Sequence, residues 1–257
     1  AGGEKLRVVA KIASRFYPGS FEVVDALLRG RESEGEVLLV SHLCHPMPGA
    51  HDNASGAAAL LEVATTLAGL IAAGRLPRPQ RGIRCIWVPE FTGSYAWLAD
   101  HEAEVLAGRW IAGLNLDMVG ANQCLTNGVW KIVGLPEAGA AFADHLLAWL
   151  WEPLLEGQRW EESIFEAGSD HYIMSDPAID IPTPMVTQWP DKFYHTSADT
   201  VDKVSPESLR RSGALAATYA YWLANAGADD ARRLGHWMMS RLAAAAGKRA
   251  ARAAAAI

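Results

Sequence analysis

The stretch Val37–Ala73 begins VLLVSHLCHP and runs through GAHDNASG into a long segment rich in Ala and Leu. Its first part, Val37–His42, is a short run of apolar and branched residues, which is typical of a buried strand. Its last part, Ala54–Ala73, follows Asp52-Asn53 directly, so we expect a helix that starts there. A strand followed by a helix of this length predicts one unit of a parallel sheet with a helix packed on its face.

The same alternation of short apolar runs and longer helical patterns continues along the chain. It predicts an α/β fold with a mostly parallel central sheet and helices on both faces. The other expected strands are Leu6–Ser14, Glu22–Leu28, Gly82–Val88, Trp110–Asp117, Val129–Val133 and Thr183–Thr187. The other expected helices are Gly93–Ala107, Ala138–Trp151 and Pro206–Ala226.

Composition and charge exclude several classes of protein. Half of the 257 residues are hydrophobic and 20% are charged, as in a globular protein with a large core. The formal net charge is -6, and without a basic stripe we expect no nucleic-acid partner. We recognise neither an apolar stretch near the ~20 residues of a membrane span nor a signal peptide, so we expect no membrane partner and a cytoplasmic location. Three cysteines, an odd number, favour a reducing compartment without a disulfide framework.

The two ends of the chain differ from its body. The chain begins at Ala1 and enters a strand-like run almost at once, so we expect it to be part of a longer polypeptide. From Ala228 onward the composition changes sharply to Ala and Arg, which predicts a peripheral helix or tail. The oligomeric state stays open.

Residues that can bind a metal or carry a proton stand where the expected strands end. The carboxyl ends of parallel strands meet at one edge of an α/β sheet, where ligands bind. Two further residues come from other segments: one lies just before an expected helix, and the other lies in the loop FYHTSADT. Imidazoles and carboxylates together form a ligand set suited to zinc with room for a water. The residues are His42, His45, Glu90 and Asp117 at the strand ends, with Asp52 and His195 from the other two segments.

Each of these residues also has an ordinary structural explanation. Asp52 beside a helix start is a common helix cap, and His42 could be a core histidine. His51 is expected in a surface loop. Glu90 and Asp117 have fewer such explanations, because an unpaired buried carboxylate is costly at the end of a buried strand. Their occurrence together favours a functional site.

In chain order, H-x-x-H, GAHDNASG, a strand that ends in Glu, NLDMVG, GSDH and YHTSADT resemble the zinc-dependent aminopeptidases of the glutaminyl-cyclase-like superfamily. More narrowly, SHLCHP, VPEFTGS and YHTSADTVDKVSPESL are similar to a bacterial branch of aminopeptidase-like proteins first catalogued as domains of unknown function. The resemblance covers about Glu4–Ala226. It implies a three-layer zinc-exopeptidase-like domain over residues 1–227, with residues 228–257 as an Ala/Arg-rich helix or tail.

The resemblance also implies a role for each matching residue. His42 or His45 would hold one metal together with Asp117, while Asp52 is central and can bridge to a second position that His195 holds. Glu90 takes the place of the general base. Tyr194 takes that of the hydroxyl donor to the tetrahedral intermediate, and Asp170 is a supporting residue.

Two positions depart from the usual pattern. Phe91 follows Glu90 where the family has a second acid that binds metal, so we expect one zinc rather than two. Cys44 stands where the family has an Asp that orients the first ligand, and we expect it to pack rather than bind zinc. The choice between His42 and His45 stays open: strand alignment favours the first, and the turn at Pro46 with the nearness of Asp52 favours the second.

The expected activity is that of a zinc-dependent aminopeptidase that hydrolyses an N-terminal amino acid from a peptide or aminoacyl amide, with a zinc-activated water and Glu90 as general base. The alternatives are a zinc amidohydrolase or glutaminyl-cyclase-like acyl transferase, and a non-catalytic binding module. Trp189, Phe91 and Tyr95 could wall an apolar pocket or belong to the core. Glu166 is a candidate to bind the α-amine of the substrate.

Overall fold

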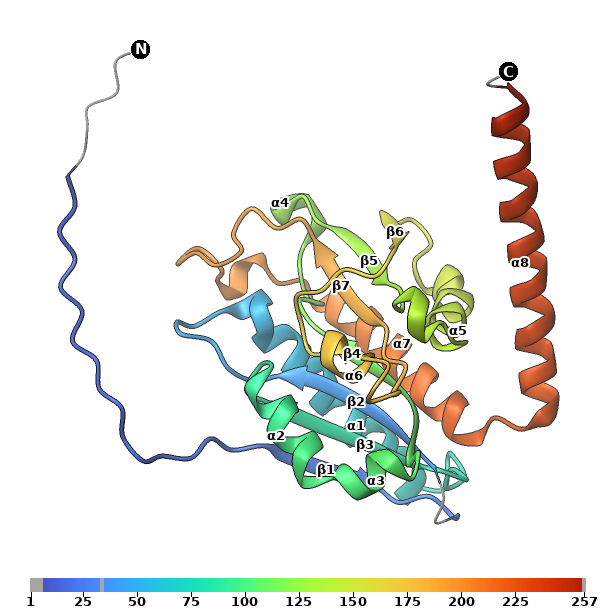
Figure 1. Cartoon of the computed structure of the whole chain (residues 1–257), viewed down its shortest axis with the longest axis horizontal. Helices are drawn as coiled ribbons and strands as arrows, with labels where there is room; N and C mark the ends of the chain where they lie inside the picture. Colours follow the sequence, from blue (N-terminus) through green and yellow to red (C-terminus); the bar gives the residue numbers. More distant parts are fainter. Residues whose placement is uncertain (1–6, 33–34, 256–257) are drawn as a thin grey trace.

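The computed structural model describes residues 7–32 and 35–255 and contains a seven-stranded sheet with the order β1-β3-β2-β4-β7-β5-β6 (Figure 1). β2, β3, β4 and β7 run parallel, β1 is antiparallel to β3, and the pair β5 and β6 runs antiparallel to β7. The α/β class with a mostly parallel sheet is therefore confirmed. The strands are β1 (Val24–Leu28), β2 (Glu36–His42), β3 (Gly82–Val88), β4 (Trp110–Leu116), β5 (Val129–Val133), β6 (Trp160–Ser163) and β7 (Met185–Trp189).

Helices cover both faces of the sheet, as predicted (Figure 1). α1, α5 and α7 pack on one face, and α2 and α6 pack on the other. The longest helix, α8, follows α7 and extends beyond the sheet. The helices are α1 (Gly56–Ala72), α2 (Thr92–Asp100), α3 (Glu102–Leu106), α4 (Gln123–Thr126), α5 (Ala143–Trp151), α6 (His171–Met174), α7 (Pro206–Asn225) and α8 (Ala228–Ala255).

β2, which includes the start of the stretch Val37–Ala73, lies at the centre of the core. Each of its seven residues is buried, as expected for a parallel strand with helices on both faces. Val37 and Leu39 face the core under α1 and α7. Leu38 and Val40 face the core under α2 and α6. His42, the last residue of β2, lies at the carboxyl edge of the sheet.

One strand prediction was wrong, and one strand was missed. The described part of Leu6–Ser14 forms no strand, and Val8 and Ile12 are 85% and 88% exposed. Branched apolar residues favour a strand only where a neighbouring strand pairs with them, and no described strand pairs with this segment. Trp160–Ser163 forms β6 although it was not expected, because its sequence WEES lacks the apolar alternation of a half-buried strand.

Two helix predictions need correction at their boundaries. Gly93–Ala107 is divided at His101, which has φ −115°, so that α2 and α3 are separate helices. Ala138–Trp151 is helical only from Ala143, with a short 3-10 turn at Glu137–Gly139 before it. Periodicity alone does not locate such breaks, because the apolar pattern continues across them.

Among the described residues, one helix is long and apolar enough to cross a membrane, contrary to expectation. Ala50–Ala72 passes this test by length and composition alone. Most of it is α1, in which Leu60, Val63 and Leu67 are buried against the sheet. Its buried residues therefore account for part of the apolar character of this stretch.

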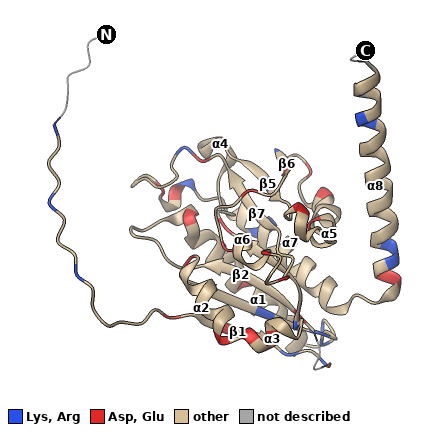
Figure 2. Cartoon of the chain, viewed as in Figure 1, with Lys and Arg blue, Asp and Glu red and all other residues tan. Residues whose placement is uncertain are grey.

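The first half of α8 contacts the α/β body. Leu234 is buried, the ring of Trp237 lies 6.3 Å from that of Trp149, and Arg241 donates to Glu162 at 2.7 Å. Figure 2 shows basic residues at separate places along α8, whose final turns lie away from the sheet. The domain boundary expected at residue 227 stays a prediction.

We predict that Gly56→Ala destabilises the protein by about 1–3 kcal/mol, the usual cost of overpacking. A Cβ at Gly56 would lie 2.3 Å from the carbonyl oxygen of Leu116 in β4 and 2.3 Å from Asn53 Oδ1. Gly69→Ala is the matched control, because a Cβ at Gly69 meets nothing within 4 Å; it should stabilise α1 by about 0.5–1 kcal/mol. Urea unfolding of both variants measures this, and equal stabilities would contradict the packing of α1 on β4.

Candidate metal centre

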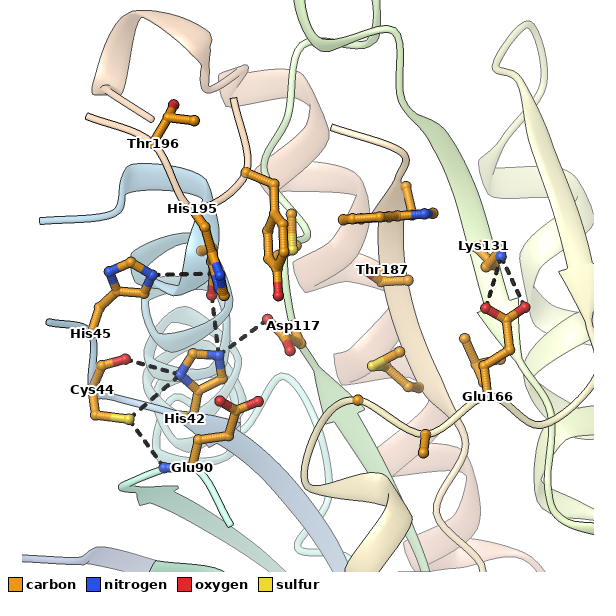
Figure 3. Close-up of a pocket in the computed structure, with 18 of the residues that line it drawn as sticks. His42, Cys44, His45, Glu90, Asp117, Lys131, Glu166, Thr187, His195 and Thr196 are labelled. Carbon is orange, nitrogen blue, oxygen red and sulfur yellow. Dashed lines mark hydrogen bonds and ion pairs between the residues drawn. The ribbon is translucent and has the colours of Figure 1, made fainter. Parts of the chain in front are cut away.

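A pocket of about 860 Å³ opens at the carboxyl edge of the sheet (Figure 3). His42 closes β2, Glu90 follows β3 and Asp117 follows β4, so three parallel strands deliver these side chains to the same edge. Asp52 reaches the pocket from the turn before α1, and His195 from the loop after β7. Segments remote in sequence thus converge on one cavity.

The first potential ligand group lies deep in this pocket. Nε2 of His42 is 3.3 Å from Oδ1 of Asp52 and 3.3 Å from Oδ1 of Asp117. All three side chains are buried. Apart from this ion-pair contact with His42, Oδ1 of Asp117 accepts no hydrogen bond, which is unusual for a buried carboxylate oxygen.

A second potential ligand group uses the other oxygen of Asp52. Oδ2 of Asp52 lies 3.4 Å from Nε2 of His45 and 3.1 Å from Nε2 of His195. The rings of the two histidines are 5.5 Å apart and nearly edge-on. Asp52 therefore belongs to both groups, with one oxygen directed to each.

These distances fit zinc. Ligands about 2.0–2.1 Å from a tetrahedral zinc lie about 3.3 Å from one another, and the four Asp52 and Asp117 contacts span 3.1–3.4 Å. Nδ1 of His42 donates to the carbonyl of Cys44 at 3.2 Å, and Nδ1 of His45 to that of Met47 at 2.6 Å. Such bonds leave Nε2 of each ring free to bind a metal.

Both histidines that the sequence left as alternatives reach Asp52, but in different groups. His42 lies beside Oδ1 of Asp52 in the group that contains Asp117, and His45 lies beside Oδ2 in the group that contains His195.

The carboxylates of Asp52 and Asp117 favour the protonated, positively charged form of His42. Burial opposes protonation of His42, yet its contacts with Asp117 and Asp52 raise its pKa to about 12. Burial likewise opposes ionisation of Asp52, but His42 and the other two imidazoles lower its pKa.

Glu90 lies beside the first group and lines the pocket. Burial raises its pKa to about 7, which the positive charge of His42 opposes and the negative charge of Asp117 supports. A carboxylate with a pKa near neutrality is suited to accept a proton and return it. The backbone N–H of Glu90 donates to Sγ of Cys44 at 3.1 Å, so the thiol connects the loop after β2 to the residue after β3.

The turn after Glu90 points Phe91 away from the pocket. Phe91 has φ 57° and ψ −60°, and its N–H donates to Oδ1 of Asp170 at 2.9 Å. The hydroxyl of Ser94 donates to the same oxygen at 2.7 Å. Phe91 packs against the core under α2 instead. Of the aromatic residues proposed as pocket walls, Trp189 lines the pocket, while Phe91 and the 59% exposed Tyr95 do not.

Tyr194 lies on the opposite wall, beside the second group. Its ring stacks on His195 at 3.7 Å and meets Trp189 edge-on at 5.0 Å. Partial burial raises the pKa of Tyr194, and the negative charges of Asp52 and Asp117 add to this. The hydroxyl therefore stays protonated at neutral pH and can donate a hydrogen bond.

Asp52 is held in place by residues that sequence reasoning missed. Oδ1 of Asp199 accepts from the N–H of His51 at 2.8 Å, and Oδ2 accepts from the N–H of Asp52 at 3.0 Å. His51, expected in a surface loop, is fully buried, with Nε2 3.6 Å from Asp191. Asp199 lies within the quoted motif YHTSADT, but no local pattern links it to residues 147 or 148 positions earlier.

Asn53 fixes the same turn from the other side. Its Nδ2 donates to Oγ of Ser41 at 3.0 Å and to the carbonyl of Leu116 at 3.2 Å. Its Oδ1 accepts from the N–H of Gly56 and of Met118, both at 3.0 Å. One buried amide thus joins β2, the end of β4 and the start of α1 around Asp52.

Glu166, proposed to bind the α-amine, lies at the far end of the pocket from His45 (Figure 3). Its carboxylate accepts from Nζ of Lys131 at 3.0 and 3.3 Å. The α-amine role of Glu166 stays a prediction, and in the structure its carboxylate pairs with Lys131.

A family model described as "Domain of unknown function (DUF4910)" matches residues 7–225. The chain belongs to this family. No curated protein matches it.

Solved structures similar to this DUF4910 chain include aminopeptidases. The aminopeptidase from Aneurinibacillus sp. strain AM-1 is 26% identical with a TM-score of 0.64, over 80% of this chain and 48% of that one. BSAP, a zinc aminopeptidase from Bacillus subtilis, is 20% identical with a TM-score of 0.66, over 80% and 50%. The LapA aminopeptidase of Legionella pneumophila is 19% identical with a TM-score of 0.63, over 79% and 60%. The chain thus spans about half the length of these proteins, and the likeness supports a peptidase fold.

We predict that Asp199→Ala destabilises the protein and weakens metal binding. It leaves the buried N–H groups of His51 and Asp52 without their acceptor, at a cost of about 1–3 kcal/mol each. Asp202→Ala is the control, because Asp202 is exposed and three residues away. Thermal unfolding and zinc titration measure both effects. Equal behaviour of the two variants would show that Asp199 does not hold the turn.

Proposed function

We propose that this DUF4910 chain is a zinc-dependent aminopeptidase that removes an N-terminal amino acid from a peptide or aminoacyl amide. The observation that carries the proposal is the pair of ligand groups that share Asp52, with Glu90 beside them in the same pocket. The aminopeptidase names of the similar structures agree with it. A cytoplasmic location and the absence of nucleic-acid and membrane partners stay predictions.

The ligand groups favour two metal positions over the single zinc expected from the sequence. His42, Asp52 and Asp117 would hold one ion, and His45, Asp52 and His195 the other. His45 thereby takes the place of the acid that is missing at Phe91. Bound zinc supplies Lewis acidity, which lowers the pKa of a bound water toward 7 and polarises a carbonyl group.

The residues of the chain divide the proton transfers between them. Glu90 would accept the proton of the attacking water and deliver it to the leaving amine, and its place in the pocket beside the first group suits this role. Tyr194 would donate its hydroxyl hydrogen to the oxygen that becomes negative in the tetrahedral intermediate. Its ring stacks on His195, a member of the second group, and lines the same pocket.

The alternatives make different use of the same residues. An amidohydrolase or an acyl transferase that cyclises an N-terminal residue would also need Glu90, and release of ammonia rather than an amino acid would reveal it. A non-catalytic module was favoured by Phe91. His45 weakens that argument, because a complete second group forms without an acid at position 91.

We predict about two zinc ions per wild-type chain after purification without chelator, measured by elemental analysis. His45→Ala should lower the content to about one ion, because it removes a ligand from one group only. Asp52→Ala should lower it further, since both groups share Asp52. His101→Ala is the control, because His101 lies away from the pocket and stacks on Trp97. Wild-type protein that binds no zinc, even after zinc is added, would refute the metal centre.

We predict that Glu90→Gln lowers kcat for an aminoacyl p-nitroanilide by about 10²–10⁴-fold, the usual contribution of a general base. Its zinc content should remain that of the wild type, because Glu90 belongs to neither ligand group. Glu102→Gln is the matched control on an exposed turn of α3. Full activity of the Gln variant would rule out the assigned role, and loss of zinc would show that Glu90 is a ligand instead.

A further inference from the structure

The floor of the pocket beyond the metal centre is one face of the β5–β7 ladder. Lys131 pairs with Thr187, and Val133 pairs with Met185. Alternate residues of a strand face the same side of a sheet, and all four of these residues line the pocket, with Trp189 next along β7. The floor is therefore apolar except for Thr187 and Lys131.

Lys131 is an unusual residue for such a floor. Only 9% of its surface is exposed, and it is the only Lys or Arg among the described residues that line this pocket. Its Nζ lies 3.0 Å from Glu166 and 3.6 Å from Glu161. Figure 3 shows the Lys131–Glu166 pair at the opposite end of the pocket from His45 and His42.

The two members of the pair differ in how easily each can change partner. The stem of Lys131 is fixed in a buried strand, whereas the side chain of Glu166 is 49% exposed on the loop between β6 and α6. A buried ammonium that loses its anion is strongly destabilising, but a half-exposed carboxylate can turn to water. Glu161 is 54% exposed and at a longer distance, so it compensates poorly.

This difference decides which charge the pocket can accept. An incoming carboxylate can replace Glu166 on the ammonium, because Lys131 keeps an anion and Glu166 becomes solvated. An incoming cation that takes Glu166 from Lys131 leaves the buried ammonium with only the more distant Glu161. An ammonium also has three N–H donors, so it can bind a second carboxylate without losing the first.

We propose that Lys131 determines specificity and that the pocket takes substrates whose N-terminal side chain ends in a carboxylate. This inference rests on the proposed aminopeptidase function. The reacting carbonyl would lie at the metal centre, and the side chain would extend over Met185 and Val133 to Lys131. A pocket of about 860 Å³ is in the usual range for small ligands.

The test compares kcat/KM for the p-nitroanilides of glutamate, leucine and lysine with the zinc-loaded protein. The wild type should prefer the glutamyl over the lysyl substrate by at least about tenfold, the effect of one charge-assisted hydrogen bond. Lys131→Met should lower kcat/KM for the glutamyl substrate by at least about tenfold and leave the leucyl substrate within about threefold. Lys131→Arg should keep the preference. Lys192→Met is the matched control, since Lys192 is exposed and does not line the pocket.

Glu166→Gln provides a second variant in case Lys131→Met does not fold. It removes the carboxylate that competes with the substrate and should raise the ratio of glutamyl to leucyl kcat/KM. A wild-type preference for the lysyl or leucyl substrate would overturn the proposal. So would an equal loss with both glutamyl and leucyl substrates in Lys131→Met, because a structural role would produce it.

Calorimetric binding of free L-glutamate and L-leucine separates this inference from the proposed function. If no p-nitroanilide is hydrolysed, the aminopeptidase proposal fails, but the pocket can still be tested. Tighter binding of L-glutamate to the wild type, lost in Lys131→Met and kept in Lys192→Met, would support the acidic subsite. Equal binding of the two amino acids would overturn it.

Discussion

The carboxylate of Asp52 is the contact on which the rest of the site depends, because each of its oxygens faces a different set of side chains. A carboxylate can serve two positions in this way only if its orientation is fixed. The backbone on either side of Asp52 supplies that constraint. Asp199 binds the amides of residues 51 and 52, and the buried side chain of Asn53 joins this turn to the ends of β2 and β4. Strand ends and bridging carboxylate are therefore parts of a single hydrogen-bonded unit.

The departures from the aminopeptidase pattern are connected in space. Asp170 holds the turn that directs Phe91 away from the pocket. A side chain at position 91 therefore does not complete the second potential ligand group. His45, three residues beyond β2, occupies that side of Asp52 instead. Cys44, immediately before it, accepts the N–H of Glu90. The loop after β2 thus supplies a member of the second potential ligand group, and it also contacts the residue that would act as base.

The sequence predicted what depends on local pattern. The central strands β2, β3 and β4 were found with nearly correct bounds, and because parallel strands align their carboxyl ends, the convergence of His42, Glu90 and Asp117 followed. Contacts across long sequence separations were not predictable. Asp199 and His51 are 148 residues apart, and the solvent exposure assigned to His51 was wrong because its burial comes from the segment around Asp191 and Asp199. Edge strands were the other weakness: β6 has no apolar alternation, and residues 7–14 have the pattern without a described partner.

The two ends of the pocket follow the same electrostatic rule with opposite results. A buried charge needs an opposite charge close to it. At one end, Asp52 and Asp117 surround a single buried imidazole, and the excess of negative charge favours a bound cation. At the other end, the buried charge is the ammonium of Lys131, and its partner Glu166 is half-exposed. The first end is therefore suited to a metal ion, and the second end is the one at which we propose that a substrate carboxylate replaces Glu166. A substrate that presents a carbonyl to the first and a carboxylate to the second would complement both, whereas a cationic side chain would oppose the second.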